Sequence, residues 1–332
     1  MPLLVPNDEQ RAAIDHRGGV LRVLGAARTG RTETAVALVL DRIRRGEAST
    51  DEVLLLASTR QDAARLRRRV MVELGGTATA PVARTASSLA FGILRRRAAL
   101  LGDPPPRLLN GPEQDIVIRD LLAGHASGRV AAPPWPERVR GALPTRAFRG
   151  ELRDLLMRAV EHSLGAADLA LLGEEHEVPE WTAAAHVLEE YDRVTALAGP
   201  GAYDPAWIVA AAAEALLDDP ALAATVRSRL RLVVVDDAQE LTPGSARLVG
   251  AIAEIPSAQP LDIVLLGDPD ASVQSFRGAD PAILAGGTGA TVDWRRLSRT
   301  GTSTTIRLRT AYRPPRLVEA TQIGRASCRE RV

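Results

Sequence analysis

The sequence predicts an α/β protein with a parallel β-sheet and a large helical insertion. Four short apolar runs have the composition of buried parallel strands: Val20–Leu24, Val53–Ala57, Leu230–Val235 and Ile263–Leu266. Helical periodicity follows the first two runs, over Arg31–Arg45 and Gln61–Leu74. Apolar strands that alternate with helices are typical of a sheet whose strands all run in one direction.

The stretch before the third run, from about residue 110 to residue 229, is too long to be a loop. Apolar residues recur there at helical spacing over Leu152–Val160, Ala183–Ala198 and Ile208–Leu217. Proline clusters at Pro104–Pro106 and Pro133–Pro136 mark boundaries or loops. We therefore expect a helical subdomain inserted into the sheet domain.

Composition excludes several classes of protein. Of the 332 residues 45% are apolar, enough for a sizeable core, and the formal net charge is +1. Any nucleic-acid contact must therefore come from local patches. The single cysteine, Cys328, excludes a disulfide framework and a cysteine-ligated metal site. The sequence shows no signal peptide and no apolar run of membrane-spanning length, so we expect a cytoplasmic protein without a membrane partner.

A glycine-bearing turn follows the first strand. It reads GAARTGRT and matches the phosphate-loop pattern G-x-x-x-x-G-K-S/T, except for Arg31 in place of Lys. The glycines permit a tight turn, backbone N–H groups would hold phosphate, and the last hydroxyl would reach Mg²⁺. The alternative is an ordinary strand–helix turn. The expected ATP-binding residues here are Gly25, Ala26, Ala27, Arg28, Thr29, Gly30, Arg31 and Thr32.

Two acidic residues end the third strand, in the segment VVVDDAQE at Val233–Glu240. An apolar strand that ends in acid is the usual Mg²⁺-holding partner of a phosphate loop. Asp236 would hold the ion together with Thr32, and Asp237 would orient or deprotonate the attacking water. The alternative is a pair of acids that only caps a strand end.

Four motifs follow one another along the chain: NDEQRAAI at Asn7–Ile14, DDAQE at Asp236–Glu240, GDPDASVQSFRGA at Gly267–Ala279 and TAYRP at Thr310–Pro314. In this order they make the chain resemble superfamily 1 DNA helicases of the UvrD/Rep/PcrA type, nearly up to Gln322. The resemblance implies a RecA-like P-loop NTPase core with a parallel sheet and a large helical insertion subdomain. It also implies ATP and Mg²⁺ as cofactors. An unrelated phosphate-loop ATPase is disfavoured by the later motifs.

Carried over residue by residue, the resemblance assigns further roles. Gln10 would read the adenine edge, Tyr312 would stack on the base, and Arg313 would reach the γ-phosphate as an arginine finger. Gln239 would join Asp237 in catalysis. The alternative for Tyr312 and Arg313 is an ordinary buried tyrosine beside a surface arginine.

Three positions depart from the family pattern. Arg31 replaces a lysine, Asp237 replaces a glutamate that is one methylene longer, and Ala271 replaces a glutamine that senses the γ-phosphate. Arginine and lysine present different hydrogen-bond geometry, and a withdrawn base is poorly placed. Together these changes predict slow hydrolysis, although nucleotide binding can survive them.

The resemblance also predicts a track for single-stranded DNA. Hydroxyl and arginine side chains would contact phosphates, and an aromatic ring would stack on a base. The expected DNA-binding residues are Ser58, Thr59, Arg60, Thr85, Ser88, Gln274 and Phe276. The basic run Arg65–Arg69 is better interpreted as a solvated helix face.

The expected domains are a core in two parts (1–108 and 200–302), a helical insertion (109–199) and the start of a second core (303–322). Residues 323–332 resemble a translated sequencing adapter, so we expect the natural sequence to stop near Gln322. We also expect that this fragment does not unwind DNA, because it lacks most of the second core and the hydrolysis site forms between two cores.

The first functional hypothesis is an ATP-dependent helicase or translocase that acts on single-stranded DNA and duplex junctions in DNA repair or double-strand-break resection. The alternative is a hydrolysis-poor structural subunit, which resembles the AdnA-type motor of actinobacterial helicase–nucleases and would pair with a second subunit. ATPase activity stimulated by single-stranded DNA distinguishes the two.

Overall fold

The computed structural model describes residues 5–76, 82–198, 201–286, 292–294, 297 and 303–312. Its centre is a parallel sheet with the strand order β3-β2-β6-β7-β1-β8. The strands are β1 (Val20–Gly25), β2 (Val53–Leu56), β3 (Ala83–Arg84), β6 (Leu232–Val235), β7 (Asp262–Gly267) and β8 (Ser303–Leu308). Every residue of β2, β6 and β7 is buried, as expected for strands covered on both faces. The predicted α/β class with a parallel sheet is therefore confirmed.

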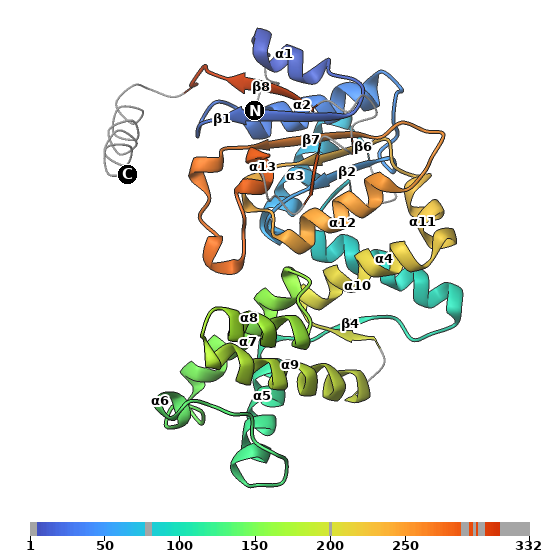
Figure 1. Cartoon of the computed structure of the whole chain (residues 1–332). Helices are drawn as coiled ribbons and strands as arrows, with labels where there is room; N and C mark the ends of the chain where they lie inside the picture. The colour runs from blue at the N-terminus through green and yellow to red at the C-terminus, as the bar shows by residue number, and fades with distance from the viewer. Residues whose placement is uncertain are drawn as a thin grey trace, which may run out of the picture.

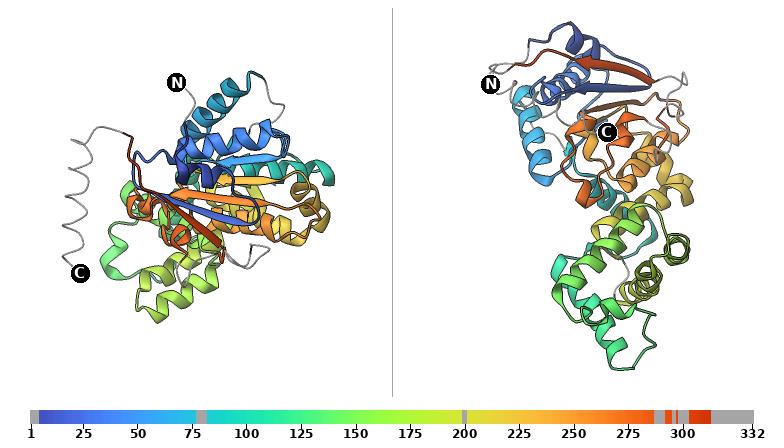
Figure 2. Two further views of the ribbon diagram at one scale, coloured as in Figure 1. Left: turned by 90° about the horizontal axis from the view of Figure 1, so that it is seen from above. Right: turned by 60° about the vertical axis from the view of Figure 1, so that its left-hand side comes forward.

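Helices cover both faces of the sheet (Figures 1 and 2). One face carries α1 (Asp8–Ile14), α2 (Arg31–Arg44) and α3 (Arg60–Leu74), whose apolar side chains share one hydrophobic cluster with the sheet. The other face carries α4 (Ala86–Leu101), α10 (Pro205–Asp218), α11 (Pro220–Arg227), α12 (Pro243–Glu254) and α13 (Ala282–Ala285). The result is a three-layer core with the sheet between two layers of helices.

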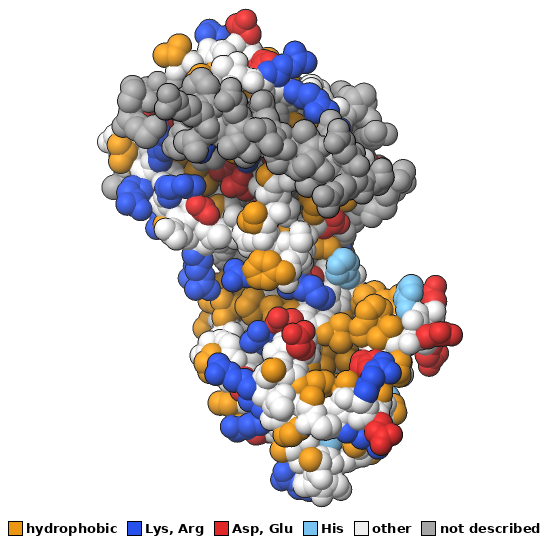
Figure 3. Space-filling model, turned by 90° about the vertical axis from the view of Figure 1, so that its left-hand side faces the viewer, with side chains coloured by type: hydrophobic (Ala, Val, Ile, Leu, Met, Phe, Trp, Pro, Cys, Tyr) orange, Lys and Arg blue, Asp and Glu red, His pale blue; other side chains and the backbone are white. Residues whose placement is uncertain are grey.

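A second, helical part extends from one end of this core (Figure 1). It contains α5 (Gly111–Ala126), α6 (Glu137–Arg140), α7 (Arg146–Glu161), α8 (Ala166–Glu175) and α9 (Pro179–Ala198). These helices pack around their own cluster, which includes Ile118, Leu156 and Leu188. A space-filling view shows a narrower waist between the two parts, with apolar side chains exposed beside it (Figure 3).

The segment that leads into the helical part pairs with the segment that leads out of it. Strands β4 (Arg107–Leu108) and β5 (Ala202–Tyr203) pair in parallel. Beside them the buried carboxylate of Asp204 accepts a 2.6 Å hydrogen bond from the Tyr191 hydroxyl and another from the Gln114 amide. Because buried charge is tolerated only when it is hydrogen-bonded, this network fixes α5, α9 and α10 to one another.

The last described strand corrects one expectation. We expected the alternating segment near residue 304 to open a second core domain. The strand in this segment, β8, instead belongs to the first sheet, so the prediction is wrong for this strand. β8 pairs in parallel along β1, from Val20 opposite Ser303 to Gly25 opposite Leu308. Its alternation has a simple cause, because an edge strand buries only part of its surface, and Leu308 packs against the cluster of α2.

No helix in the described ranges is both long and apolar enough to cross a membrane.

Candidate nucleotide-binding site

The phosphate loop lies between β1 and α2, at the carboxyl edge of the sheet. Gly30 is the residue before α2 and has a φ of 82°, in the left-handed region that favours glycine. A Cβ at Gly30 would lie 2.8 Å from Nε2 of Gln10, and a Cβ at Gly25 would lie 2.5 Å from Oγ1 of Thr29. Both glycines are therefore required by backbone conformation or close packing. The free N–H groups of the first turn of α2 face the loop, as in an anion site.

The acidic strand end meets this loop directly. The hydroxyl of Thr32 donates a 2.9 Å hydrogen bond to Oδ2 of Asp236, which follows β6. Asp236 is 4% exposed, and its second oxygen, Oδ1, has no hydrogen-bond partner among the described residues. Burial, reinforced by the neighbouring charge of Asp237, raises the pKa of Asp236 to about 6. The hydrogen bond from Thr32 and the charge of Arg31 lower this pKa, but they only partly offset the effect of burial.

These residues fit a hard divalent cation. An unpartnered carboxylate oxygen beside a hydroxyl is an oxygen donor set of the kind that Mg²⁺ uses with substrate phosphates. The described residues contain no group of three or more His, Cys, Asp or Glu that could hold an ion alone. Thr32 and Asp236 would therefore supply the protein ligands, and phosphate and water the others.

Both terminal nitrogens of Arg31 contact other groups of the protein. Its Nη2 lies 3.2 Å from Oδ1 of Asp237, and its Nη1 donates to the backbone carbonyl of Gly25. Asp237 itself has a left-handed backbone with a φ of 52°. The two residues that depart from the lysine–glutamate pattern thus contact each other. The arginine side chain is longer than that of lysine, and it reaches the carboxylate of an aspartate that is one methylene shorter than glutamate.

Gln239 connects the acidic pair to the next strand. It lies on the 3₁₀ turn η1 (Ala238–Glu240) and is 4% exposed. Its Nε2 donates to Oδ1 of Asp237 at 3.2 Å, and its Oε1 accepts the backbone N–H of Asp268 at 3.1 Å. A Cβ at Gly267 would lie 2.5 Å from Oε1 of Gln239, so this contact needs glycine at the end of β7.

Gln10 and Tyr312 lie together on the other side of the phosphate loop. A capping box at Asn7 starts α1 and orients Gln10, which is fully buried. Nε2 of Gln10 donates to the carbonyl of Thr29 at 3.2 Å, and Oε1 accepts the Tyr312 hydroxyl at 3.0 Å. The N–H of Tyr312 donates to the carbonyl of Arg28. Three segments distant in sequence therefore meet at this loop.

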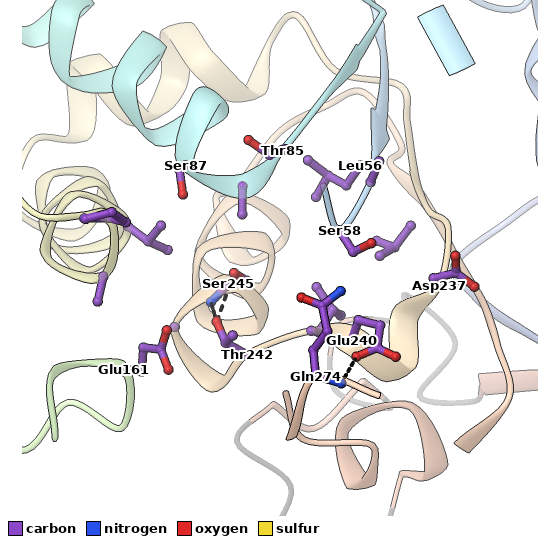
Figure 4. Close-up of a pocket in the computed structure, with 18 of the residues that line it drawn as sticks. Leu56, Ser58, Thr85, Ser87, Glu161, Asp237, Glu240, Thr242, Ser245 and Gln274 are labelled. Atoms are coloured by element: carbon purple, nitrogen blue, oxygen red, sulfur yellow. Dashed lines mark hydrogen bonds between the residues drawn. The ribbon is translucent and has the colours of Figure 1, made fainter. Parts of the chain in front are cut away.

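Three of the seven predicted DNA residues border a cavity of about 170 Å³ at the same edge of the sheet (Figure 4). Ser58, Thr85 and Gln274 line it, together with Asp236, Asp237, Glu240 and Glu161. Figure 4 shows Glu161 on the opposite side of the cavity from Asp237. The cavity thus joins the acidic pair to the helical part of the molecule.

Two predicted DNA residues cap helices, and one of them, Thr85, also lines this cavity. The hydroxyl of Thr59 caps α3 by accepting the N–H of Asp62, and the hydroxyl of Thr85 caps α4 by accepting the N–H of Ser88. Capping is a structural role that these side chains have in any case. Arg60 is exposed at the start of α3. Phe276 is 75% exposed on η3 (Ser275–Arg277), with the Arg277 guanidinium 5.3 Å from its ring centroid.

A family model for the UvrD/REP helicase N-terminal domain matches residues 6–287. The chain belongs to this family. The chain is similar to ATP-dependent DNA helicase UvrD1 of Mycobacterium tuberculosis, with 26% identity over 287 residues, 82% of the chain and 34% of the relative. It is also 26% identical to UvrD2 of that organism over 293 residues, 84% of the chain and 38% of the relative.

A third relative of this UvrD/REP chain is the RecBCD enzyme subunit RecB of Mycobacterium tuberculosis. The identity is 26% over 317 residues, which cover 80% of the chain and 27% of the relative. The chain therefore spans about a third of the length of the curated relatives that it matches.

In this UvrD/REP chain, Arg313 lies outside the described residues.

Two residues that sequence reasoning did not single out also border the site. The carboxylate of Glu240 accepts the backbone N–H groups of Val273 and Gln274 at 2.9 and 3.0 Å, and Figure 4 shows the second of these hydrogen bonds. Glu161, at the end of α7, is mostly buried, and burial raises its pKa to about 7 despite an ion pair with Arg158. Glu240 lies inside a recognisable motif, whereas nothing local in the sequence marks Glu161.

Proposed function

We propose that the chain is the ATP-binding core of a UvrD-type DNA helicase or translocase that acts on single-stranded DNA. The observation that carries this proposal is the hydrogen bond between Thr32 and Asp236, beside a carboxylate oxygen without a partner. It supports one Mg²⁺–nucleotide site built from β1 and β6. Family membership supports ATP as the nucleotide and DNA as the substrate.

In this proposal each residue has a separate task. Bound Mg²⁺ would neutralise phosphate charge and orient the triphosphate, held by Thr32 and Asp236. Backbone N–H groups of the loop would bind the phosphates. Asp237, oriented by Gln239, would align the attacking water or accept its proton. Tyr312 and Gln10 would contact the base, and we keep Arg313 as the proposed γ-phosphate contact.

The same geometry connects the proposed nucleotide site with the proposed DNA contact. Turn η1 hydrogen-bonds to both ends of the segment between Asp268 and Gln274, through Gln239 at one end and Glu240 at the other. The exposed ring of Phe276 follows two residues later and could stack on a base. A shift of η1 on nucleotide binding would therefore displace the proposed DNA contact. We keep single-stranded DNA and duplex junctions as the proposed partners.

The Arg31–Asp237 contact favours a second candidate function. The Arg31 guanidinium occupies Oδ1 of Asp237, one of the two carboxylate oxygens that could otherwise accept a hydrogen bond from the attacking water. A hydrolysis-poor subunit of a heterodimeric helicase–nuclease, such as the AdnA type, would have this property. The RecB relative is itself named as a subunit of an enzyme. Either form would act in DNA repair or double-strand-break resection.

ATP turnover with and without single-stranded DNA, measured on the complete gene product, decides between the two candidates. Robust stimulated turnover by the parent protein supports the motor. Turnover that appears only after the double change Arg31→Lys, Asp237→Glu supports the hydrolysis-poor subunit. An absence of Mg²⁺-dependent ATP binding in both proteins would contradict the proposal as a whole.

A further inference from the structure

The phosphate loop contains two arginines, and they differ in how their terminal nitrogens are used. Both terminal nitrogens of Arg31 have protein partners, Gly25 and Asp237. Arg28 is half-buried and forms no ion pair with the described residues, and its buried Nη1 has no acceptor among them. Arg28 therefore keeps a donor of the kind that binds phosphate.

The backbone of Arg28 is also unusual. Its φ is 72°, and only four non-glycine residues in the described part of the chain have a positive φ: Arg28, Ser163, Glu177 and Asp237. A side chain in this region is strained, and such strain tends to persist at functional sites. The carbonyl of Arg28 accepts the N–H of Tyr312 at 3.1 Å, which helps to hold the residue in this conformation. The loop thus retains an arginine where glycine would be less strained.

We propose that Arg28, rather than Arg31, is the cation of the phosphate loop that binds the terminal phosphates of ATP. This inference rests on the proposed nucleotide site. A planar guanidinium with a free terminal nitrogen suits an oxyanion that accepts two parallel hydrogen bonds. Arg31 meanwhile stays with Asp237 and positions that carboxylate. Because the terminal phosphate carries the extra negative charge, Arg28 gives the site its preference for a nucleoside triphosphate over a diphosphate.

Equilibrium binding to the 332-residue chain tests this assignment. Fluorescent N-methylanthraniloyl ATP and ADP are titrated in the presence of Mg²⁺, and thermal unfolding is followed in parallel. Arg28→Gly should weaken ATP binding roughly tenfold to a hundredfold, the range of a lost charge-assisted hydrogen bond, and ADP binding much less. Because glycine accepts a positive φ, the unfolding midpoint should stay unchanged or rise. Arg28→Lys should retain part of the preference for ATP.

Two controls make the outcome decisive. Glu177→Gly removes a side chain at another positive φ, of 55°, in the helical part, and should leave nucleotide binding unchanged. Arg31→Gln should weaken ATP binding less than Arg28→Gly does. Equal affinity of the Arg28→Gly variant and the parent for ATP would overturn the inference while the site itself stood, provided that Thr32→Val still lost Mg²⁺-dependent binding. A parent chain that bound no ATP would overturn both.

Discussion

The hydroxyl of Thr32 and the carboxylate of Asp236 are joined by a 2.9 Å hydrogen bond, although 204 positions separate them in the sequence. The sheet produces this contact. β1 and β6 both pair with β7 in parallel, so the carboxyl ends of all three strands reach the same edge. Side chains that follow those strands must therefore converge there.

Gly30 should be intolerant of any side chain. Gly30→Ala should lower the free energy of unfolding by about 2–4 kcal/mol, because it adds a left-handed backbone penalty and a clash with Gln10 at 2.8 Å. Gly46→Ala is the matched control, since its φ is 70° and a Cβ there would meet nothing within 4 Å. Urea unfolding measures both. Equal losses in the two variants would contradict the proposed role of the Gln10 contact.

Arg31 and Asp237 should be energetically coupled, but weakly. Their side chains are 13% and 36% exposed, so solvent screens the ion pair, and we expect a coupling of about 0.5–1 kcal/mol. A double-mutant cycle with Arg31→Gln and Asp237→Asn, followed by urea unfolding without nucleotide, gives this value. Strict additivity of the two changes would show that the pair is not formed in solution.

Glu161 should make stability depend on pH. Its folded pKa of about 7 exceeds the ordinary value of 4.5, so the folded state binds the proton more tightly than the unfolded state. Its contribution is therefore fully present below pH 4.5 and is lost as the pH rises to about 7. Each pKa unit of difference corresponds to about 1.4 kcal/mol. Relative to Glu161→Gln, the parent should lose stability across this window.

The matched control for that pH series is Glu175→Gln, because Glu175 is an exposed glutamate at the end of α8. Its difference from the parent should stay constant with pH. If the Glu161→Gln variant and the parent lost stability in parallel between pH 4.5 and 7, the burial of this carboxyl in solution would be disproved.

Phe276 should contribute to DNA binding without contributing to stability. The ring is 75% exposed, so Phe276→Ala should leave the unfolding midpoint unchanged. If the ring stacks on a base, the same change should cost about 1–3 kcal/mol in affinity for a fluorescent single-stranded oligonucleotide. Val273→Ala, at a 74% exposed position in the same loop, should have little effect. Similar losses in both variants would argue against stacking.

Much of this architecture could be predicted because it follows from local rules. Buried parallel strands read as short apolar runs, and a phosphate loop has fixed spacing, so the loop and the acidic pair were found from the sequence. The capping roles of Thr59 and Thr85 also follow a local rule, since hydroxyl residues before a helix accept its first N–H groups.

The features that could not be predicted depend on contacts between distant segments. β8 has the alternation of any edge strand, and only its pairing with β1 shows which sheet it joins. Glu161 looks like a surface residue at a helix end, and its burial arises because α7 packs against α12 and the loop at Gly278. The pairing of Arg31 with Asp237 likewise depends on the meeting of two strand ends.

The central claim is that the phosphate loop and the acidic strand end form one Mg²⁺–nucleotide site. Titration of fluorescent ATP into the parent chain and the Asp236→Asn variant, each with Mg²⁺ and with EDTA, tests it most directly. The account predicts that Mg²⁺ strengthens binding to the parent and that this gain disappears in Asp236→Asn. An equal gain from Mg²⁺ in both proteins would contradict it.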